Sequence, residues 1–472
     1  MPSIFLHLLP YLIVLGWSGY YLITALQWYS YRIERILFHF HRPAWHILYL
    51  IAPVGFLFCN PWVGAGIALL GALFFKWQVK EGAKLTKRVK LFLGMVMGIG
   101  LLLYLPLTLF HWNLGFGVVG ALLSALILDH FIDKWETGKY YKQAFEKLER
   151  ISPVVVGVTG SYGKTSIKHF LAQLLSKKYR VYFSPGSVNT LKGIIKDINT
   201  NLPEDTQIYI GEAGARQPGD IKEIVDLIRP HYAILGKIGA QHLEYFKSLE
   251  NIIATKLEIF TSPRLKKGVS YQHFQFPVPD KVIVIEKRIS DVKADLSGVR
   301  WKLEIDGKKE EFFAPVLGEF NAINISLAIY VAKAFLPLEE IKKRVAQLKP
   351  VPHRLQKIEA GGKIVIDDSF NGNLEGVLKS FQLVKQFPGK KIIVTPGLLE
   401  VPDEFNQQIA DHINEIFDYA IITGEKNRKL FQQLLKIPFS IAKDKKELEK
   451  LLATKTFPGN LILFSNDFPP YL

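Results

Sequence analysis

Residues 154–166 read VVVGVTGSYGKTS, and this stretch decides the fold of the chain around it. A β-branched run leads into a glycine-rich turn and then into an amphipathic stretch, which predicts a strand, a loop and a helix in that order. Gly160 and Gly163 let the loop backbone wrap a phosphate with its N–H groups, at the positive end of the helix dipole. Lys164 can reach the β- and γ-phosphates of a nucleotide, and Thr165 can hold Mg²⁺. The stretch therefore predicts a nucleotide-binding α/β domain.

One position departs from the common phosphate-loop pattern, because Val158 stands where that pattern has glycine. The alternative is a glycine turn beside a chance Lys-Thr pair. The strand expected before the turn and the helix expected after it favour the phosphate loop.

On both sides of the loop, short β-branched runs alternate with amphipathic stretches, which is typical of α/β proteins. We expect strands at Val154–Val158, Val181–Phe183, Gln207–Ile210 and Tyr232–Leu235, with helices between them. An antiparallel patch is expected from Lys281–Ile285, Arg300–Ile305 and Glu310–Ala314, followed by helices at Glu319–Phe335 and Leu338–Leu348.

Two prolines in the stretch 349–352 mark a boundary. Beyond them, strands near 363–367, 391–395, 418–423 and 460–464 predict a second, Rossmann-like α/β domain. We therefore expect three parts, a helical region at 1–150, a central domain at 151–350 and a C-terminal domain at 351–472.

The first third of the chain has a different composition. Hydrophobic residues make up 49% of the 472 residues and charged residues 22%, which excludes a disordered chain. The single cysteine, Cys59, excludes a disulfide framework and a zinc ribbon. The apolar excess lies before about residue 135, in runs at Ile4–Tyr29, Ala44–Phe75, Leu91–Phe110 and Leu114–Ile132. Asn60-Pro61 divides the second run into two short helices, so we predict five membrane spans. A re-entrant hairpin at 44–75 is the alternative.

The basic residues of this region agree with five spans. The net charge is +16, and the cations cluster after the first, third and fifth spans, at Arg32–Arg42, Lys76–Lys90 and Lys134–Arg150. With the N-terminus outside, all three clusters lie on the cytoplasmic side, as the positive-inside rule requires. The positive charge is thereby assigned to topology and to anionic lipid headgroups, and nucleic acid is not needed as a partner.

Six motifs in order resemble the Mur ligase family, over about residues 152–472. They are TGSYGKTS at 159–166 and the segments 211–221, 238–244, 254–259, 318–324 and 367–373. The last, DDSFNGN, is similar to a segment of the branch that joins D-alanyl-D-alanine to a UDP-linked muramoyl tripeptide. Each motif alone is weak, whereas their ordered set is specific.

The resemblance implies ATP- and Mg²⁺-dependent amide formation in peptidoglycan precursor synthesis, in which a carboxylate is activated as an acyl phosphate and an amine then attacks it. It assigns nucleotide binding to Gly160, Ser161, Gly163, Lys164, Thr165, Ser166, Asn321, Asn324, Arg354 and Asp368. It assigns metal binding to Thr165, Glu212, His242 and Lys256, the lysine being carbamylated in several members. Catalysis is assigned to Lys164, His242 and Lys256, and substrate contacts to Ser187, Asn189, Asn371 and Asn373.

The chain also departs from the family, most clearly at its front, where the usual UDP-binding domain is replaced by the membrane region. We therefore expect a multi-pass protein of the bacterial inner membrane with cytoplasmic ligase domains, acting on either a UDP-linked or a lipid-linked precursor. Phe370 replaces the usual tyrosine and Leu374 replaces the usual proline. These two departures leave the identity of the amine substrate open. A transporter is disfavoured because the expected spans lack buried charges. A non-catalytic anchor is disfavoured because the predicted site residues are intact.

Overall fold

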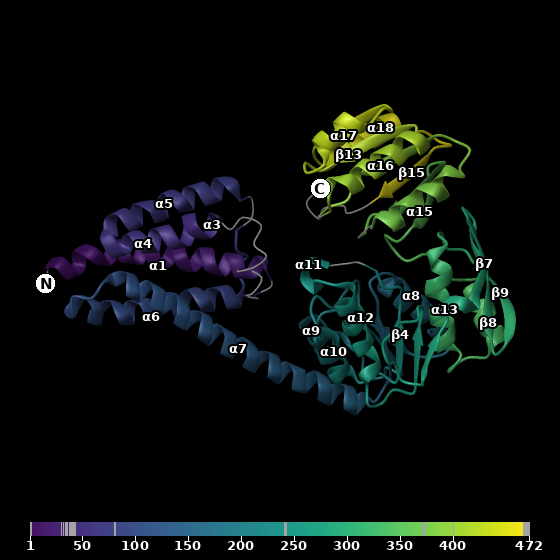
Figure 1. Ribbon diagram of the computed structural model, residues 1–472, viewed down its shortest axis with the longest axis horizontal. Coiled ribbons are helices and arrows are strands. Elements are labelled where there is room, and N and C mark those ends of the chain that lie inside the picture. Colours follow the sequence, from purple (N-terminus) through teal and green to yellow (C-terminus); the bar gives the residue numbers. More distant parts are fainter. Residues whose placement is uncertain are drawn as a thin grey trace. The chain divides into compact units, whose positions relative to one another are not determined.

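The computed structural model describes residues 2–29, 31, 33, 36, 44–79, 82–239, 243–370, 373–399 and 401–465. The chain divides into two compact units, Met1–Lys139 and Tyr140–Leu472 (Figure 1).

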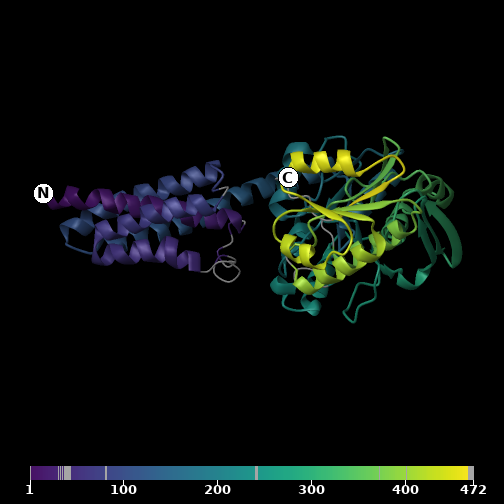
Figure 2. The same ribbon diagram turned by 90° about the horizontal axis from the view of Figure 1, so that it is seen from above.

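The first unit is helical. Its elements are α1 (Pro2–Trp28), α3 (Ala44–His46), the π-helix η1 (Ile47–Ile51), α4 (Ala52–Cys59), α5 (Pro61–Gln78), α6 (Lys87–Leu109) and the first part of α7 (Leu114–Ile151). Figures 1 and 2 show α1, α4, α5 and α6 running alongside one another. Among the described residues, three helices are long and apolar enough to cross a membrane, at Leu6–Trp28, Lys87–Leu109 and Leu114–Ile151. The count of five spans stays a prediction.

The expected break in the second apolar run is present. Asn60 ends α4 and caps α5, because its side-chain oxygen accepts hydrogen bonds from the N–H groups of Trp62 and Val63. Pro61 occupies the first helical position, where its missing N–H has no cost. The run 44–75 is therefore an α4–α5 hairpin and not one long helix.

The last helix is longer than the sequence suggested. The span expected at Leu114–Ile132 continues without interruption to Ile151, so the basic residues after it lie on a helix and not in a loop. Nothing in the stretch 133–151 breaks a helix strongly, and Ala144 and Leu148 repeat at helical spacing and are buried in the second unit. Within that unit, Lys147 Nζ donates to the carbonyl of Ile198 at 2.9 Å.

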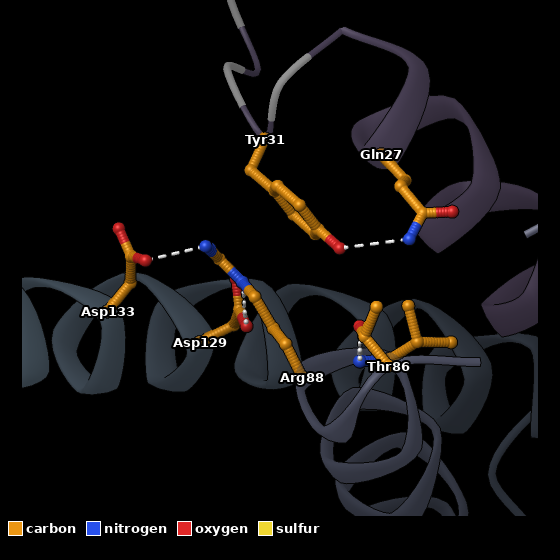
Figure 3. Close-up of polar contacts among 7 residues, drawn as sticks. Gln27, Tyr31, Thr86, Arg88, Asp129 and Asp133 are labelled. Carbon is orange, nitrogen blue, oxygen red and sulfur yellow. Dashed lines mark hydrogen bonds and ion pairs between the residues drawn. The ribbon is translucent and has the colours of Figure 1, made fainter. Parts of the chain in front are cut away.

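The first unit contains a cluster of charges that corrects the expectation of spans without buried charges, because Asp129 in the expected span 114–132 is buried (Figure 3). Arg88, in the first turn of α6, forms two hydrogen bonds with Asp129, from Nη2 to Oδ2 at 2.6 Å and from Nε to Oδ1 at 3.0 Å. Its Nη1 reaches Asp133 Oδ1 at 2.5 Å, and its guanidinium lies 3.9 Å from the ring centre of Tyr31. Asp129 and Asp133 share a face of α7 one turn apart, so a single arginine fork joins α6 to α7.

A second polar contact secures the loop before α6. Both amide atoms of Gln27 pair with the backbone of Lys84, the N–H donating to Oε1 at 2.7 Å and the carbonyl accepting from Nε2 at 3.0 Å. The sequence placed Arg88 among the loop cations, and the fold pairs it with acidic residues more than 40 positions away.

The second unit begins with a six-stranded parallel sheet in the order β2-β3-β1-β4-β5-β6. Its strands are β1 (Val154–Thr159), β2 (Val181–Phe183), β3 (Ile208–Glu212), β4 (Tyr232–Leu235), β5 (Lys267–Ser270) and β6 (Val282–Val284). Its helices are α8 (Lys164–Leu175), α9 (Leu191–Asn201), α10 (Asp220–Ile228), α11 (Leu243–Phe246), α12 (Leu249–Leu257) and the 3₁₀ turn η2 (Glu258–Thr261), followed later by α13 (Phe320–Ala332) and α14 (Leu338–Val345). One apolar core joins a face of the sheet to α8 and α13, and another joins the other face to α9, α10 and the end of α7.

The antiparallel patch differs from the one expected. The run 281–285 forms β6, which pairs in parallel with β5 and closes the edge of the main sheet. After a 3₁₀ turn, η3 (Glu286–Arg288), the patch consists of β7 (Ile289–Asp295), β8 (Gly298–Ile305) and β9 (Lys308–Ala314). A β-bulge between Ser290 and Lys293 interrupts the alternation of β7, which hid this strand in the sequence.

The C-terminal part holds a second six-stranded sheet, in the order β10-β11-β15-β12-β13-β14. Its strands are β10 (Gln356–Ala360), β11 (Lys363–Asp368), β12 (Lys391–Thr395), β13 (Tyr419–Thr423), β14 (Phe439–Ala442) and β15 (Leu461–Ser465), and only β10 is antiparallel to its neighbour. The helices α15 (Leu374–Lys385), α16 (Asp403–Ile416), α17 (Arg428–Leu434) and α18 (Lys445–Lys455) cover both faces of this sheet (Figure 2).

Candidate functional site

The phosphate loop lies between β1 and α8, as the sequence predicts. Gly160 has φ +152° and Gly163 has φ +78°, which are backbone conformations that favour glycine. A Cβ at Gly163 would collide with the side-chain oxygen of Asn324, so a side chain is excluded here by contact as well as by conformation. The N–H groups of Ser161 and Tyr162 donate to the carbonyl of Lys237, at 3.0 and 3.1 Å. The loop is thereby held against the segment that follows β4.

Lys164 turns back onto its own loop. Its Nζ donates to the carbonyls of Gly160 at 2.8 Å and Ser161 at 3.1 Å. Burial lowers the pKa of Lys164, while the nearby Glu212 carboxylate acts in the opposite direction. The ammonium group is therefore in place beside the loop that would receive a phosphate.

Glu212 is the centre of the site. It ends β3 beside Val158 of β1, at the carboxyl edge of the sheet, and it is 1% exposed. Thr165 Oγ1 donates to its Oε2 at 3.0 Å, and Asn189 Nδ2 donates to its Oε1 at 3.0 Å. Lys168 Nζ forms an ion pair with Oε2 at 3.1 Å. The sequence predicted three of these four residues and missed Lys168, although its place one turn after Lys164 on α8 was a signal.

Lys256 is a buried lysine on α12, with an exposed fraction of 4%. Burial, reinforced by the positive charge of Lys164, lowers its pKa to about 7, against the opposing effect of carboxylates that include Asp220 and Glu212. An amine with this pKa is half neutral at pH 7, and the neutral form is the one that reacts with carbon dioxide.

The other predicted metal ligands separate into two groups. Thr165 and Glu212 present a hydroxyl and a carboxylate side by side, which fits Mg²⁺, since this ion commonly takes one or two protein oxygens together with phosphates. The described residues contain no group of three His, Cys, Asp or Glu side chains around one point. His242 lies outside the described residues, so its placement is not part of this geometry.

Asn321 and Asn324 lie in the first turns of α13, and both are buried. Asn324 Nδ2 donates to Asn321 Oδ1 at 3.0 Å, and Asn321 Nδ2 donates to the carbonyl of Leu317 at 2.7 Å. Their spacing of three residues places them on one face of the helix. Their amides, which the family resemblance assigns to nucleotide binding, bond to each other and to the chain, and Asn324 lies against the phosphate loop at Gly163.

Arg354 and Asp368 come from the C-terminal domain. Arg354 Nη1 donates to the carbonyl of Phe370 at 2.7 Å, and the guanidinium lies 4.4 Å from the centre of the Phe370 ring. Its charge also contributes to lowering the pKa of Lys164. Asp368 Oδ1 accepts from the N–H of Leu355 at 3.2 Å, and burial raises the pKa of this carboxyl to about 6.

The remaining predicted residues are more scattered. Ser161 donates from Oγ to the carbonyl of Gly239 at 3.0 Å, and Ser166 is buried in the first turn of α8. Ser187 is half-buried on the loop that carries Asn189. Asn373 caps α15 by accepting from the N–H of Gly376 at 3.0 Å, so its side chain is engaged in a structural bond. Asn371 lies outside the described residues.

The two domains of the second unit meet at this loop. Lys237, whose carbonyl holds the phosphate loop, extends its Nζ to Glu375 of α15, at 2.7 and 2.8 Å from the two carboxylate oxygens. This ion pair lowers the pKa of Glu375. One residue therefore connects the phosphate loop to the C-terminal domain.

Comparison with known proteins agrees with this geometry. Residues 158–332 match the Mur ligase middle domain. The UDP-N-acetylmuramoyl-tripeptide–D-alanyl-D-alanine ligase of Bacillus subtilis is 27% identical over 342 residues, which are 67% of this chain and 74% of that protein. The ligase of the same name from Escherichia coli is 27% identical over 61% of this chain and 68% of its own.

Among solved structures, MurF ligase from Thermotoga maritima in complex with ADP is similar, with a TM-score of 0.59 and 26% identity over 70% of this chain and 80% of that chain. A structure of MurF from Acinetobacter baumannii has a TM-score of 0.62 at 22% identity, which shows the shared fold. Residues 158–332 therefore match the Mur ligase middle domain, and the chain is similar to the UDP-N-acetylmuramoyl-tripeptide–D-alanyl-D-alanine ligases over about two thirds of its length.

Proposed function

We propose that this protein is an ATP-dependent ligase of peptidoglycan precursor synthesis that joins D-alanyl-D-alanine to a UDP-linked muramoyl tripeptide. The observation that carries the proposal is the arrangement around Glu212. Its carboxylate accepts a hydrogen bond from the Thr165 hydroxyl at the carboxyl edge of the sheet, and the Lys164 ammonium lies on the adjacent phosphate loop, within electrostatic range of Glu212. The ordered family motifs and the named relatives agree with this chemistry.

The reaction forms two bonds in succession. A carboxylate oxygen of the precursor attacks the γ-phosphorus of ATP, which gives an acyl phosphate and ADP. The amine of the incoming dipeptide then attacks the acyl carbon, inorganic phosphate leaves, and the amine loses a proton. Both steps bring anions together, so cations and N–H groups must offset the repulsion.

The chain's own residues can provide this. Lys164 can exchange the neutral carbonyls of Gly160 and Ser161 for phosphate oxygens, since an ammonium is attracted more strongly to an anion than to an uncharged acceptor. Arg354, whose charge already acts on Lys164, can bring a second cation from the C-terminal domain. Thr165 and Glu212 would hold Mg²⁺, which when bound offsets charge on the β- and γ-phosphates.

The location is part of the proposal. Three helices of sufficient length and apolarity support membrane attachment, and the basic residues near their ends favour a cytoplasmic ligase body at the inner membrane of a bacterium. ATP and the soluble precursors are available on that side.

A second candidate substrate is a lipid-linked form of the same precursor. It is favoured by the apolar first unit, which occupies the place where the family resemblance implies a UDP-binding domain. In this alternative the chemistry at Glu212 is unchanged and the membrane helices contribute to substrate binding.

One experiment separates the two substrates. Full-length protein in nanodiscs and a fragment starting at Tyr140 are each supplied with ATP, Mg²⁺, D-alanyl-D-alanine and either the UDP-linked or the lipid-linked tripeptide. The fragment starts at Tyr140 because the end of α7 packs in the second unit. ADP release and product mass from both proteins with the UDP-linked substrate are expected. If only the full-length protein is active, and only with the lipid-linked substrate, the second candidate is correct instead.

A further inference from the structure

Lys168 is a buried charge that the proposed chemistry does not use. Its side chain is fully buried on α8, one turn after Thr165 and Lys164. Its Nζ donates to the carbonyl of Ser184 at 2.7 Å and to the carbonyl of Gly186 at 2.7 Å, and it pairs with Glu212 Oε2 at 3.1 Å. An ammonium has three N–H groups, so these three partners occupy all of them.

Two of these partners belong to the loop 184–190, which connects β2 to α9 and carries Ser187 and Asn189. The beginning of the loop is held by Lys168, which binds the carbonyls of Ser184 and Gly186. Its end is held by Asn189, whose Nδ2 donates to Glu212 Oε1 and whose carbonyl accepts from the N–H of Gly214 at 2.7 Å. Both ends of the loop are therefore connected to the same carboxylate, one through Lys168 and one directly.

A simple packing role does not account for a lysine at this position. A buried ammonium costs desolvation free energy, and an apolar side chain of similar length would fill the space without that cost. What an apolar side chain cannot do is satisfy two inward-facing carbonyls and a carboxylate at once. The three contacts are satisfied together only when the loop lies at a fixed distance from α8 and from Glu212.

We infer that Lys168 is a positioning residue, which fixes the loop 184–190 to Glu212. It thereby holds Ser187 and Asn189, the residues assigned to substrate contacts, in a fixed position relative to the phosphate loop. The identity of the substrate at this loop rests on the proposed function. The ordering of the loop by Lys168 does not, because it follows from the three contacts alone.

The test compares Lys168→Met with a matched control, Lys196→Met, which removes an exposed lysine from α9. Three quantities are measured on the full-length protein: amide hydrogen exchange of a peptide covering 184–190, affinity for ADP in EDTA, and the separate kcat and KM values for the UDP-linked precursor.

In Lys168→Met we expect exchange in the loop to be faster by about tenfold or more, because each charge-assisted hydrogen bond is worth about tenfold or more in an equilibrium. The KM for the precursor should rise by a similar factor. The affinity for ADP should stay within about twofold, because Lys164 and the loop 160–163 are untouched.

Three outcomes would overturn the inference. Unchanged exchange in the loop, together with a lowered melting temperature, would show a purely structural role. A loss of ADP affinity as large as the rise in KM for the precursor would place Lys168 in the nucleotide site. Equal behaviour of Lys196→Met would show that the effect is not specific.

If Lys168→Met does not fold, Lys168→Arg takes its place. A planar guanidinium keeps the charge but cannot reproduce the three-way ammonium geometry, so the loop should still exchange faster while the fold is retained. Normal exchange in Lys168→Arg would contradict the inference. If the wild-type protein has no ligase activity but Lys168→Met still shows faster exchange in the loop, the proposed function is refuted and the positioning role stands.

Discussion

Lys256 provides the sharpest test of the site, because its lowered pKa sets the fraction of the side chain that is neutral at pH 7. At an ordinary lysine pKa of about 10.4, about one amine in a few thousand is neutral at pH 7. Burial, with Lys164 nearby, lowers the pKa of Lys256 to about 7, so about half of these amines are neutral at that pH. The population able to react with carbon dioxide is thus larger by roughly a thousandfold.

The perturbation is Lys256→Ala, assayed by ADP release with and without added formate or acetate. We expect activity to fall by at least about a hundredfold, since the metal-binding carbamate that the family resemblance implies would be lost, and to recover partly with the carboxylate, which would replace the carbamate oxygens. In the wild type, activity should fall when bicarbonate is stripped and return when it is supplied. At a fixed concentration of dissolved carbon dioxide, recovery should be faster as the pH rises through 7, because a lysine with a lowered pKa loses its proton in that range. A carbamate resonance in the ¹³C NMR spectrum of wild-type protein incubated with ¹³C-bicarbonate, absent from the spectrum of Lys256→Ala, would identify the group directly.

Lys196→Ala is the control, since this exposed lysine lies on α9 and is not part of the site. Near-normal turnover of Lys256→Ala without any additive would refute the reasoning. So would wild-type activity that does not respond to removal of carbon dioxide.

Other tests address the nucleotide, the membrane unit and the topology. Lys164→Ala should keep its fold and lose ATP turnover by several kcal/mol of transition-state stabilisation, about a thousandfold or more; a folded variant with normal turnover would contradict the phosphate-loop assignment. Arg88→Met should lower the unfolding free energy of the detergent-solubilised protein by roughly 1–3 kcal/mol, less than for a fully buried pair because the cluster is partly exposed; an unchanged melting temperature would mean that the cluster adds no stability. In a Cys59→Ser background, a cysteine at Asn113 should react with an impermeant reagent on intact cells and one at Lys84 should not, and the reverse pattern would overturn the proposed orientation.

Local sequence determined the nucleotide-binding part of this protein. The phosphate loop needs only a strand, two glycines with special backbone angles, and Lys-Thr at a helix start, and all of these are contiguous. The end of β3 at Glu212 and the cap at Asn60 are local in the same sense. Periodicity within short windows is sufficient to find such features.

Features that depend on pairs of distant residues required the tertiary structure. The antiparallel patch was assigned one wrong strand because β6 finds its partner only in the main sheet, and the bulge in β7 disrupts its alternation. The span expected to end at Ile132 continues, because its last turns are stabilised by packing in the second unit. The amides of Asn321 and Asn324 face each other, a choice that spacing alone does not reveal.

The charged groups show the physical reason most clearly. In sequence, Lys168 and Arg88 read as ordinary basic residues among many. The fold places Lys168 at the junction of α8, β3 and the loop 184–190, and Arg88 between Asp129 and Asp133. Whether a charge is solvated or paired depends on partners that are tens of residues away, and burial strengthens those pairs only after the chain has folded. The ordered motifs therefore predicted the reaction class through a family resemblance, and tertiary contacts decided which charges are buried and paired.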